Sequence, residues 1–89
     1  MNAFEVTIVN RLGLHARAAA KFVHLASGFT SRVTVSRDGT RVDGKSILGL
    51  LTLAASKGTK LRVTIQGDDE AEAALRISEL VRLRFGEDA

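Results

Sequence analysis

Segments with the two-residue period of a β-strand alternate along the chain with segments that have the period of a helix. This alternation limits the folds open to it. The strand-like segments are rich in β-branched or alternating apolar residues and cover residues 4–9, 32–37, 40–43 and 60–66. The helix-like segments place apolar residues three and four positions apart and cover residues 16–27, 47–56 and about 70–84. The order of elements is therefore β-α-β-β-α-β-α.

Turn and cap residues separate these segments. Asp38-Gly39 is a strong signal for a two-residue hairpin between the second and third strands. Ser46 is a suitable N-cap for the second helix, and Asp69 followed three residues later by Glu72 has the pattern of a capping box. Glycines typical of helix ends follow the three helices at positions 28, 58 and 86.

The length of 89 residues allows one domain. Four strands and three helices in such a chain favour an α+β open-faced β-sandwich, in which the helices cover one face of a single sheet. The central hairpin indicates an antiparallel or mixed sheet. We expect a single domain over residues 1–89.

Composition excludes several kinds of site. The chain has no cysteine, which excludes a disulfide scaffold, a thiolate zinc site and a thiol nucleophile. No apolar run approaches the roughly 20 residues of a membrane-spanning helix, so no membrane insertion is expected. The N-terminal residues lack a basic start followed by an apolar stretch, which argues against a signal peptide and favours a cytoplasmic location.

Charge is divided unevenly along the chain. Residues 1–62 contain ten Lys and Arg and three acids, whereas residues 63–89 contain three Lys and Arg and seven acids. A basic surface attracts phosphate, nucleic acid or an acidic protein, or is simply solvated. A nucleic-acid-binding module is disfavoured, because the four Phe are scattered and there is no Tyr or Trp to stack on bases.

His15 stands between a glycine loop and the start of the first helix. The backbone N–H groups of Ala16, Arg17 and Ala18, in the first turn, have no acceptor within a helix. These donors and the helix dipole favour negative charge and a neutral, nucleophilic imidazole, and Arg17 can bind phosphate oxygens. The pattern indicates a phosphate-carrying histidine, and the alternative is a capping histidine beside a surface arginine. His24, inside the helix, fits a surface position better than a chemical role.

Two segments resemble those of a known family. Residues 13–19, Gly-Leu-His-Ala-Arg-Ala-Ala, resemble the histidine phosphorylation motif of HPr, the histidine-containing phosphocarrier of the bacterial phosphotransferase system. Residues 44–51, Gly-Lys-Ser-Ile-Leu-Gly-Leu-Leu, are similar to the regulatory serine segment of that family. Their separation, the order of elements and the length also agree, so the resemblance covers essentially the whole chain.

The resemblance implies a four-stranded antiparallel sheet covered on one face by three helices, and a carrier rather than an enzyme. Proteins of this family accept a phosphoryl group from enzyme I, carry it on Nδ1 of the motif histidine and deliver it to an EIIA domain. Carried over, His15 is the phospho-acceptor and Arg17 stabilises the phosphate. The resemblance implies no metal and no organic cofactor, and a monomer is expected.

Ser46 has two interpretations. One is the N-cap of the second helix, worth about 1 kcal/mol. The other, implied by the resemblance, is a regulatory site phosphorylated by an HPr kinase/phosphorylase. The alternative to a carrier is a regulatory binding module of a nitrogen-type phosphotransferase branch that acts through protein contacts. The presence of His15 counts against a purely regulatory role.

An exposed apolar patch is expected around the second helix. Leu50 and Leu53, with Ala54, can face the core. The three further large aliphatic residues of this helix, Ile47, Leu48 and Leu51, cannot all point inward as well, so some of them are expected at the surface. In the family the corresponding residues dock on enzyme I and on EIIA. The expected docking patch comprises Ala20, Ile47, Leu48 and Leu51, rimmed by Arg17, Lys21 and Lys45.

Position 18 departs from the family pattern. Proline commonly follows the His-x-Arg triplet, and this chain, which has no proline, has Ala18 there. Proline fits the first turn of a helix without loss of a hydrogen bond and fixes φ. We expect the fold and phosphorylation to survive with alanine, and the site to be more flexible.

Overall fold

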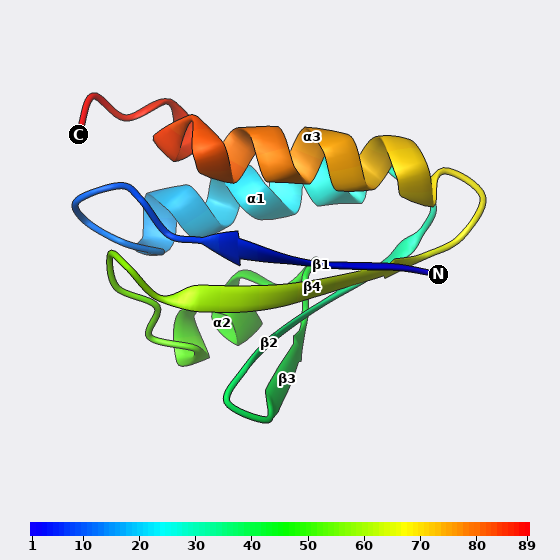
Figure 1. Cartoon of the computed structure of the whole chain (residues 1–89), viewed down its shortest axis with the longest axis horizontal. Coiled ribbons are helices and arrows are strands. Elements are labelled where there is room, and N and C mark those ends of the chain that lie inside the picture. The colour runs from blue at the N-terminus through cyan, green and yellow to red at the C-terminus, as the bar shows by residue number, and fades with distance from the viewer.

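One antiparallel sheet forms a layer of the protein in the computed structural model, which describes residues 1–89 (Figure 1). Its strands are β1 (Asn2–Thr7), β2 (Arg32–Arg37), β3 (Thr40–Asp43) and β4 (Lys60–Gln66). They lie in the order β1-β4-β2-β3, and every neighbouring pair is antiparallel. The last strand in sequence therefore lies between the first and the second.

Three helices cover one face of this sheet. They are α1 (Ala16–Ser27), α2 (Ile47–Thr52) and α3 (Glu70–Arg82), and a short 3-10 turn at Arg84–Gly86 follows α3. α1 and α3 run side by side (Figure 1). The short α2 contacts α1 and β3. The predicted fold class is thus confirmed. None of the helices is long and apolar enough to cross a membrane.

The core lies between the helices and the inner face of the sheet. Alternate residues of the central strands point inward and are buried, namely Val33, Val35, Leu61, Val63 and Ile65. Each such side chain contributes about 1.5–3 kcal/mol relative to an exposed position. Mostly polar residues occupy the alternate, outward positions, so the second face of the sheet is left open.

Local patterns predicted several elements correctly. The bounds of β2, β3, β4 and α1 are those expected from the sequence. The hairpin between β2 and β3 turns at Asp38 and Gly39, whose φ values are 49° and 86°. A two-residue hairpin that matches the twist of its strands needs positive φ at both central residues, and this Asp-Gly pair provides it.

The second helix is shorter than predicted. We expected it to reach Ser56, but α2 ends at Thr52, and Ala54 has a left-handed backbone with φ of 49° through which a helix does not continue. Ala54 is exposed rather than in the core. Beyond it, the carbonyl of Ala55 accepts a hydrogen bond of 2.8 Å from the N–H of Leu14. A contact with a distant loop therefore fixes this segment.

The first strand is displaced from its predicted position over residues 4–9. Its partner β4 begins at Lys60, which lies opposite Thr7, so the ladder between the two strands ends there. Ile8 continues beyond the ladder with two hydrogen bonds to the loop before β4. It donates to the carbonyl of Thr59 at 2.9 Å and accepts from the N–H of Gly58 at 2.7 Å.

The predicted capping box at the start of α3 is wrong. Asp69 occupies the N-cap position but makes no side-chain hydrogen bond to the helix. Its carboxylate accepts hydrogen bonds from the N–H groups of Thr30, at 2.9 Å, and Ser31, at 3.0 Å, and from the Ser31 hydroxyl. These partners lie in the loop between α1 and β2, so Asp69 joins that loop to α3.

The chain turns sharply after α3. Arg84, Phe85 and Gly86 have positive φ values of 58°, 55° and 78°. Phe85 is buried in the core, and its carbonyl accepts a hydrogen bond of 2.7 Å from Lys21 Nζ on α1. The C-terminal tail is thereby brought back to the start of α1 (Figure 1).

Candidate functional site

His15 is the N-cap residue of α1, and its backbone is extended, with φ of −79° and ψ of 177°. Its carbonyl accepts the first hydrogen bond of the helix, from the N–H of Ala19 at 2.8 Å. Its imidazole caps no backbone N–H and is 27% exposed. The side chain is therefore available for interactions outside the helix.

Backbone contacts fix the loop that carries His15. Gly13 has φ of 71°, and a Cβ at this position would lie 2.6 Å from the carbonyl oxygen of Ala55, so both conformation and space require glycine. The next residue, Leu14, is buried. Asn10, fully buried, donates from Nδ2 to the Gly13 carbonyl at 2.7 Å. The loop thus presents His15 from a rigid support.

The first turn of α1 offers backbone donors beside the imidazole. The helical hydrogen bonds begin at Ala19, and the three preceding N–H groups, of Ala16, Arg17 and Ala18, have no acceptor in the chain. The first turn contains no acidic residue. Free donors and the positive end of the helix dipole stabilise an anion here by about 0.3–1 kcal/mol, and more where it is partly buried.

A hollow of about 310 Å³ lies beside His15. It is lined by Arg11, Leu12, His15, Arg17 and the C-terminal residues 87–89. Arg17 is exposed. The structure therefore brings the imidazole of His15 and the side chain of Arg17, both singled out in the sequence, to one concave surface.

Glu87 belongs to this site and was missed in the sequence. Its Oε2 lies 2.5 Å from His15 Nε2, and its Oε1 accepts a hydrogen bond of 2.9 Å from Asn10 Nδ2. Glu87 follows His15 by 72 residues, so no local pattern connects the two. The only signal in the sequence is the excess of acidic residues in the last third of the chain.

The surroundings of Glu87 favour its ionised form. The hydrogen bond from Asn10 is the largest cause, followed by the hydrogen bond with His15, and together they lower the pKa of the Glu87 carboxyl below its ordinary value. Partial burial acts in the opposite direction and is a smaller effect. At neutral pH the carboxylate is charged and can only accept hydrogen bonds.

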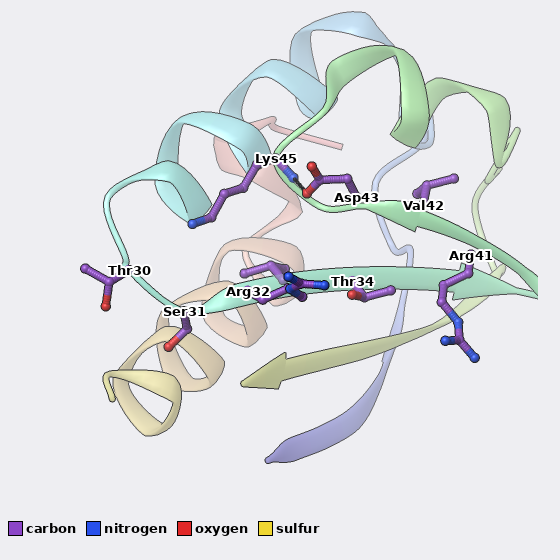
Figure 2. Close-up of a pocket in the computed structure, with 9 residues that line it drawn as sticks. Thr30, Ser31, Arg32, Thr34, Arg41, Val42, Asp43 and Lys45 are labelled. Carbon is purple, nitrogen blue, oxygen red and sulfur yellow. Dashed lines mark hydrogen bonds between the residues drawn. The ribbon is translucent and has the colours of Figure 1, made fainter. Parts of the chain in front are cut away.

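A larger hollow, of about 590 Å³, lies at the ends of β2 and β3 and does not include His15 (Figure 2). Arg32, Arg41 and Lys45 line it, together with Asp43. In Figure 2 the three cationic side chains point in different directions. Their charges do not converge on one point, so this hollow is not arranged to hold a phosphate.

The family model for the PTS HPr component phosphorylation site matches residues 3–82 of the chain. The chain belongs to the HPr family. It is 52% identical over 84 residues to the phosphocarrier protein HPr of Xylella fastidiosa, and the match covers 94% of each chain. The predicted resemblance is thus confirmed, and the chain is a phosphocarrier of the phosphotransferase system, not an enzyme.

Solved HPr structures share the fold. The chain is similar to a structure of HPr-C-His from Thermoanaerobacter tengcongensis, with a TM-score of 0.96, 40% identity and full coverage of both chains. It is also similar to a structure of an HPr dimer from the same organism, with a TM-score of 0.78 and 41% identity over 98% of this chain and 100% of the other.

In this HPr-family chain the residues of the expected docking patch lie on two helices, α1 and α2, that pack together. Leu48 is 77% exposed and Ile47 is 40% exposed. Leu51 and Ala20 are half-buried, and Leu51 packs against the core. The patch is therefore apolar at its surface and supported by the core beneath it.

The cationic residues expected around the HPr docking patch have different surroundings. Lys21 Nζ donates to the carbonyl of Phe85 at 2.7 Å, which holds this ammonium at the C-terminal tail. Lys45 Nζ donates to the carbonyl of Phe29 at 2.8 Å, at the loop after α1. Both lysines are thus bound to backbone carbonyls, whereas Arg17 is exposed beside His15.

Ser46 caps α2, as its sequence position predicts. Its Oγ accepts a hydrogen bond of 3.0 Å from the N–H of Gly49, and its carbonyl accepts one of 3.0 Å from the N–H of Leu50. The residue is half-buried and directly precedes Ile47 and Leu48. Its hydroxyl therefore lies at the edge of the expected docking patch.

Proposed function

We propose that His15 accepts a phosphoryl group from phosphorylated enzyme I and passes it to an EIIA domain. The observation that carries this proposal is the placement of a partly exposed imidazole at the start of α1, beside three backbone N–H groups without acceptors. A phosphate attached there meets free donors and the positive end of the helix dipole. The match of the family's phosphorylation-site model over residues 3–82 supports the same assignment.

Phosphoryl transfer to His15 depends on the alignment of the reacting groups and on stabilisation of charge rather than on a cofactor. Phosphoryl transfer passes through a loose transition state, so alignment and electrostatic stabilisation dominate. The lone pair of His15 Nδ1 forms a bond to phosphorus while the bond from phosphorus to the donor breaks, and the donor keeps that electron pair. Transfer to EIIA is the same exchange with His15 as the leaving group.

Arg17 is proposed to stabilise the transferred phosphate. Its side chain lines the hollow beside His15 and is exposed. A guanidinium can donate two parallel hydrogen bonds to phosphate oxygens, which fixes orientation as well as charge. Because Arg17 does not hold the core, its role belongs to transfer rather than to folding.

The docking patch of Ala20, Ile47, Leu48 and Leu51 is proposed to bind enzyme I and EIIA in turn. Exposed large aliphatic side chains on so small a domain are typical of a binding surface. The neighbouring cations, Arg17, Lys21 and Lys45, suit an acidic partner and would accelerate a brief encounter.

Ser46 is proposed as the site at which an HPr kinase/phosphorylase regulates docking. Negative charge at a helix N-terminus is well tolerated, so the phosphate would not disrupt α2. It would lie beside Ile47 and Leu48, and its desolvation in an interface is costly. Phosphorylation of Ser46 would therefore weaken docking without altering His15.

We also propose a cytoplasmic monomer, in keeping with the small size of the chain and with the expectation from its family. A Thermoanaerobacter tengcongensis HPr has been solved as a dimer, so the association state is worth measuring directly. Sedimentation across a range of concentrations is expected to give the mass of one chain, and a stable dimer would contradict this part of the proposal.

Substitution of the two histidines tests the function. His15→Ala removes the proposed acceptor, and His24→Ala removes an exposed imidazole from the same helix. With phosphoenolpyruvate and enzyme I, the wild type and His24→Ala are expected to gain one acid-labile phosphate, whereas His15→Ala gains none. An acid-stable adduct, or one that persists in His15→Ala, would contradict the proposal.

A further inference from the structure

Glu87 joins the imidazole of His15 to a buried amide. One carboxylate oxygen lies 2.5 Å from His15 Nε2, and the other accepts a hydrogen bond of 2.9 Å from Asn10 Nδ2. The Glu87 side chain is only 16% exposed. The contact is therefore partly shielded from solvent, unlike an exposed surface ion pair.

The segment that carries Glu87 is fixed on both sides. Before it, Phe85 is buried and its carbonyl accepts a hydrogen bond of 2.7 Å from Lys21 Nζ. After it, the carbonyl of Ala89 accepts a hydrogen bond of 3.0 Å from the N–H of Arg11. The tail is thus attached to α1 and to the loop that precedes His15.

Asn10 connects the two halves of this arrangement. Its Nδ2 donates both to Glu87 and to the carbonyl of Gly13, in the loop that carries His15. Both partners are acceptors, so the orientation of the amide is determined. Asn10 Oδ1 is buried and accepts no hydrogen bond from the chain.

The contact also determines which nitrogen of His15 carries the proton. An ionised carboxylate has no proton to donate, so the atom that faces it, Nε2, must carry one. In a neutral imidazole the other nitrogen, Nδ1, then holds the lone pair. The carboxylate can also stabilise the positive charge that the ring gains when Nδ1 forms a bond, as the carboxylate does in a Ser-His-Asp triad.

We propose that Glu87 is a positioning residue for phosphoryl transfer, which holds the His15 ring in one orientation and in the tautomer with its lone pair on Nδ1. This inference rests on the proposed function of His15. In the step, the Nδ1 lone pair forms the bond to phosphorus and the donor leaves with the electrons of its own bond. The Nε2 proton stays between His15 and Glu87, and the new positive charge of the ring faces the carboxylate.

Glu87→Gln is the decisive variant. The carboxamide keeps the size of the side chain, but it has one oxygen for the two donors that the carboxylate serves. We expect the ¹⁵N spectrum of the neutral His15 ring to move toward the Nδ1–H tautomer. We expect kcat for phosphorylation by enzyme I to fall by about 10–100-fold, the size of effect that follows the loss of a hydrogen-bond partner that orients a metal-binding histidine. KM for enzyme I should not change, because Glu87 lies outside the docking patch.

Two further variants separate positioning from general effects of charge or folding. Glu79→Gln makes the same substitution on the exposed surface of α3 and is expected to match the wild type. Glu87→Asp keeps the charge at a shorter reach and is expected to recover part of the lost rate. Wild-type tautomer and rate in Glu87→Gln would overturn the inference, as would a loss of rate with no change in tautomer.

Failure of this inference is distinguishable from failure of the proposed function. If the wild type takes no phosphate on His15 from enzyme I, the function itself is wrong and the role of Glu87 fails with it. If the wild type and Glu87→Gln load His15 at the same rate, the function stands and only the role of Glu87 is overturned.

Discussion

The N-cap of α1 is a histidine whose side chain caps no backbone N–H, whereas at α2 the hydroxyl of Ser46 binds the N–H of Gly49. A capping Ser, Thr, Asp or Asn contributes about 0.5–2 kcal/mol, and α1 does without it. In return, the donors of its first turn stay free beside the imidazole. The His15 N-cap therefore stabilises α1 less than a capping hydroxyl would, but it leaves these N–H groups free to bind an anion.

Substitution of Ala18 by proline tests how much backbone order the first turn of α1 needs. It is the third residue of α1, it is buried, and its N–H has no acceptor, so Ala18→Pro breaks no helical hydrogen bond. Reduced freedom of the unfolded chain should raise the free energy of unfolding by about 0.4–1 kcal/mol in a urea titration. Phosphohistidine should hydrolyse faster, because one of the donors facing the phosphate is lost. The prediction fails if neither quantity changes.

Among the elements, α1, β2 and β4 could be predicted because each buries the face that its own apolar period defines. The strand β3 could be predicted because the Asp38-Gly39 turn pairs it with β2. The end of α2 could not, because Ala54 turns left-handed and the next carbonyl binds the N–H of Leu14 from a distant loop. The role of Asp69 was missed for the same reason. Its local pattern is that of a cap, and partners in another loop take its carboxylate.

The residues of the candidate site also differ in whether the sequence could predict their proximity. His15 and Arg17 are close in sequence and share one helix start, so their proximity could be predicted. Glu87 reaches His15 only because α3 ends in a run of positive φ values that turns the tail back, and because Phe85 anchors that turn in the core. No sequence period encodes such a contact.

The hydrogen bonds through which Asp69 joins the α1–β2 loop to α3 should affect the free energy of unfolding at acidic pH. Hydrogen bonds, led by that from the Ser31 hydroxyl and then the N–H of Thr30, lower the pKa of Asp69 from 3.8 to about 2. A lowered folded-state pKa contributes stability that is present above the unfolded value and is lost as pH falls toward the folded one. The free energy of unfolding should therefore decrease between about pH 4 and pH 2. In Asp69→Asn that decrease should be smaller.

The neighbouring carboxyl provides the control for this measurement. Asp68 is exposed and adjacent in sequence, and Asp68→Asn is expected to keep the wild-type slope in denaturation curves recorded across the same pH range. Glu70 and Glu87 also have lowered pKa values, so part of the slope remains in Asp69→Asn. Equal slopes in Asp69→Asn and the wild type would contradict the prediction.

For the whole molecule, the main question is which exposed apolar residues serve partners. Leu48 on α2 is 77% exposed and Leu75 on α3 is 66% exposed, so neither is needed for the core. Leu48→Asp and Leu75→Asp should each change the free energy of unfolding by no more than about 0.5 kcal/mol. Only Leu48→Asp should raise KM for enzyme I, by about tenfold or more, which corresponds to the loss of an interface anchor. If both variants raised KM for enzyme I equally, α2 would not be part of the docking surface.

The two ends of the chain lie at opposite ends of the molecule (Figure 1). The amino group of Met1 lies 3.0 Å from Glu70 at the start of α3, whereas Ala89 lines the hollow of His15. A reporter or affinity handle joined to the N-terminus would therefore leave the hollow open. The same handle joined after Ala89 would start inside it, so the choice of fusion site decides whether binding experiments report on the native carrier.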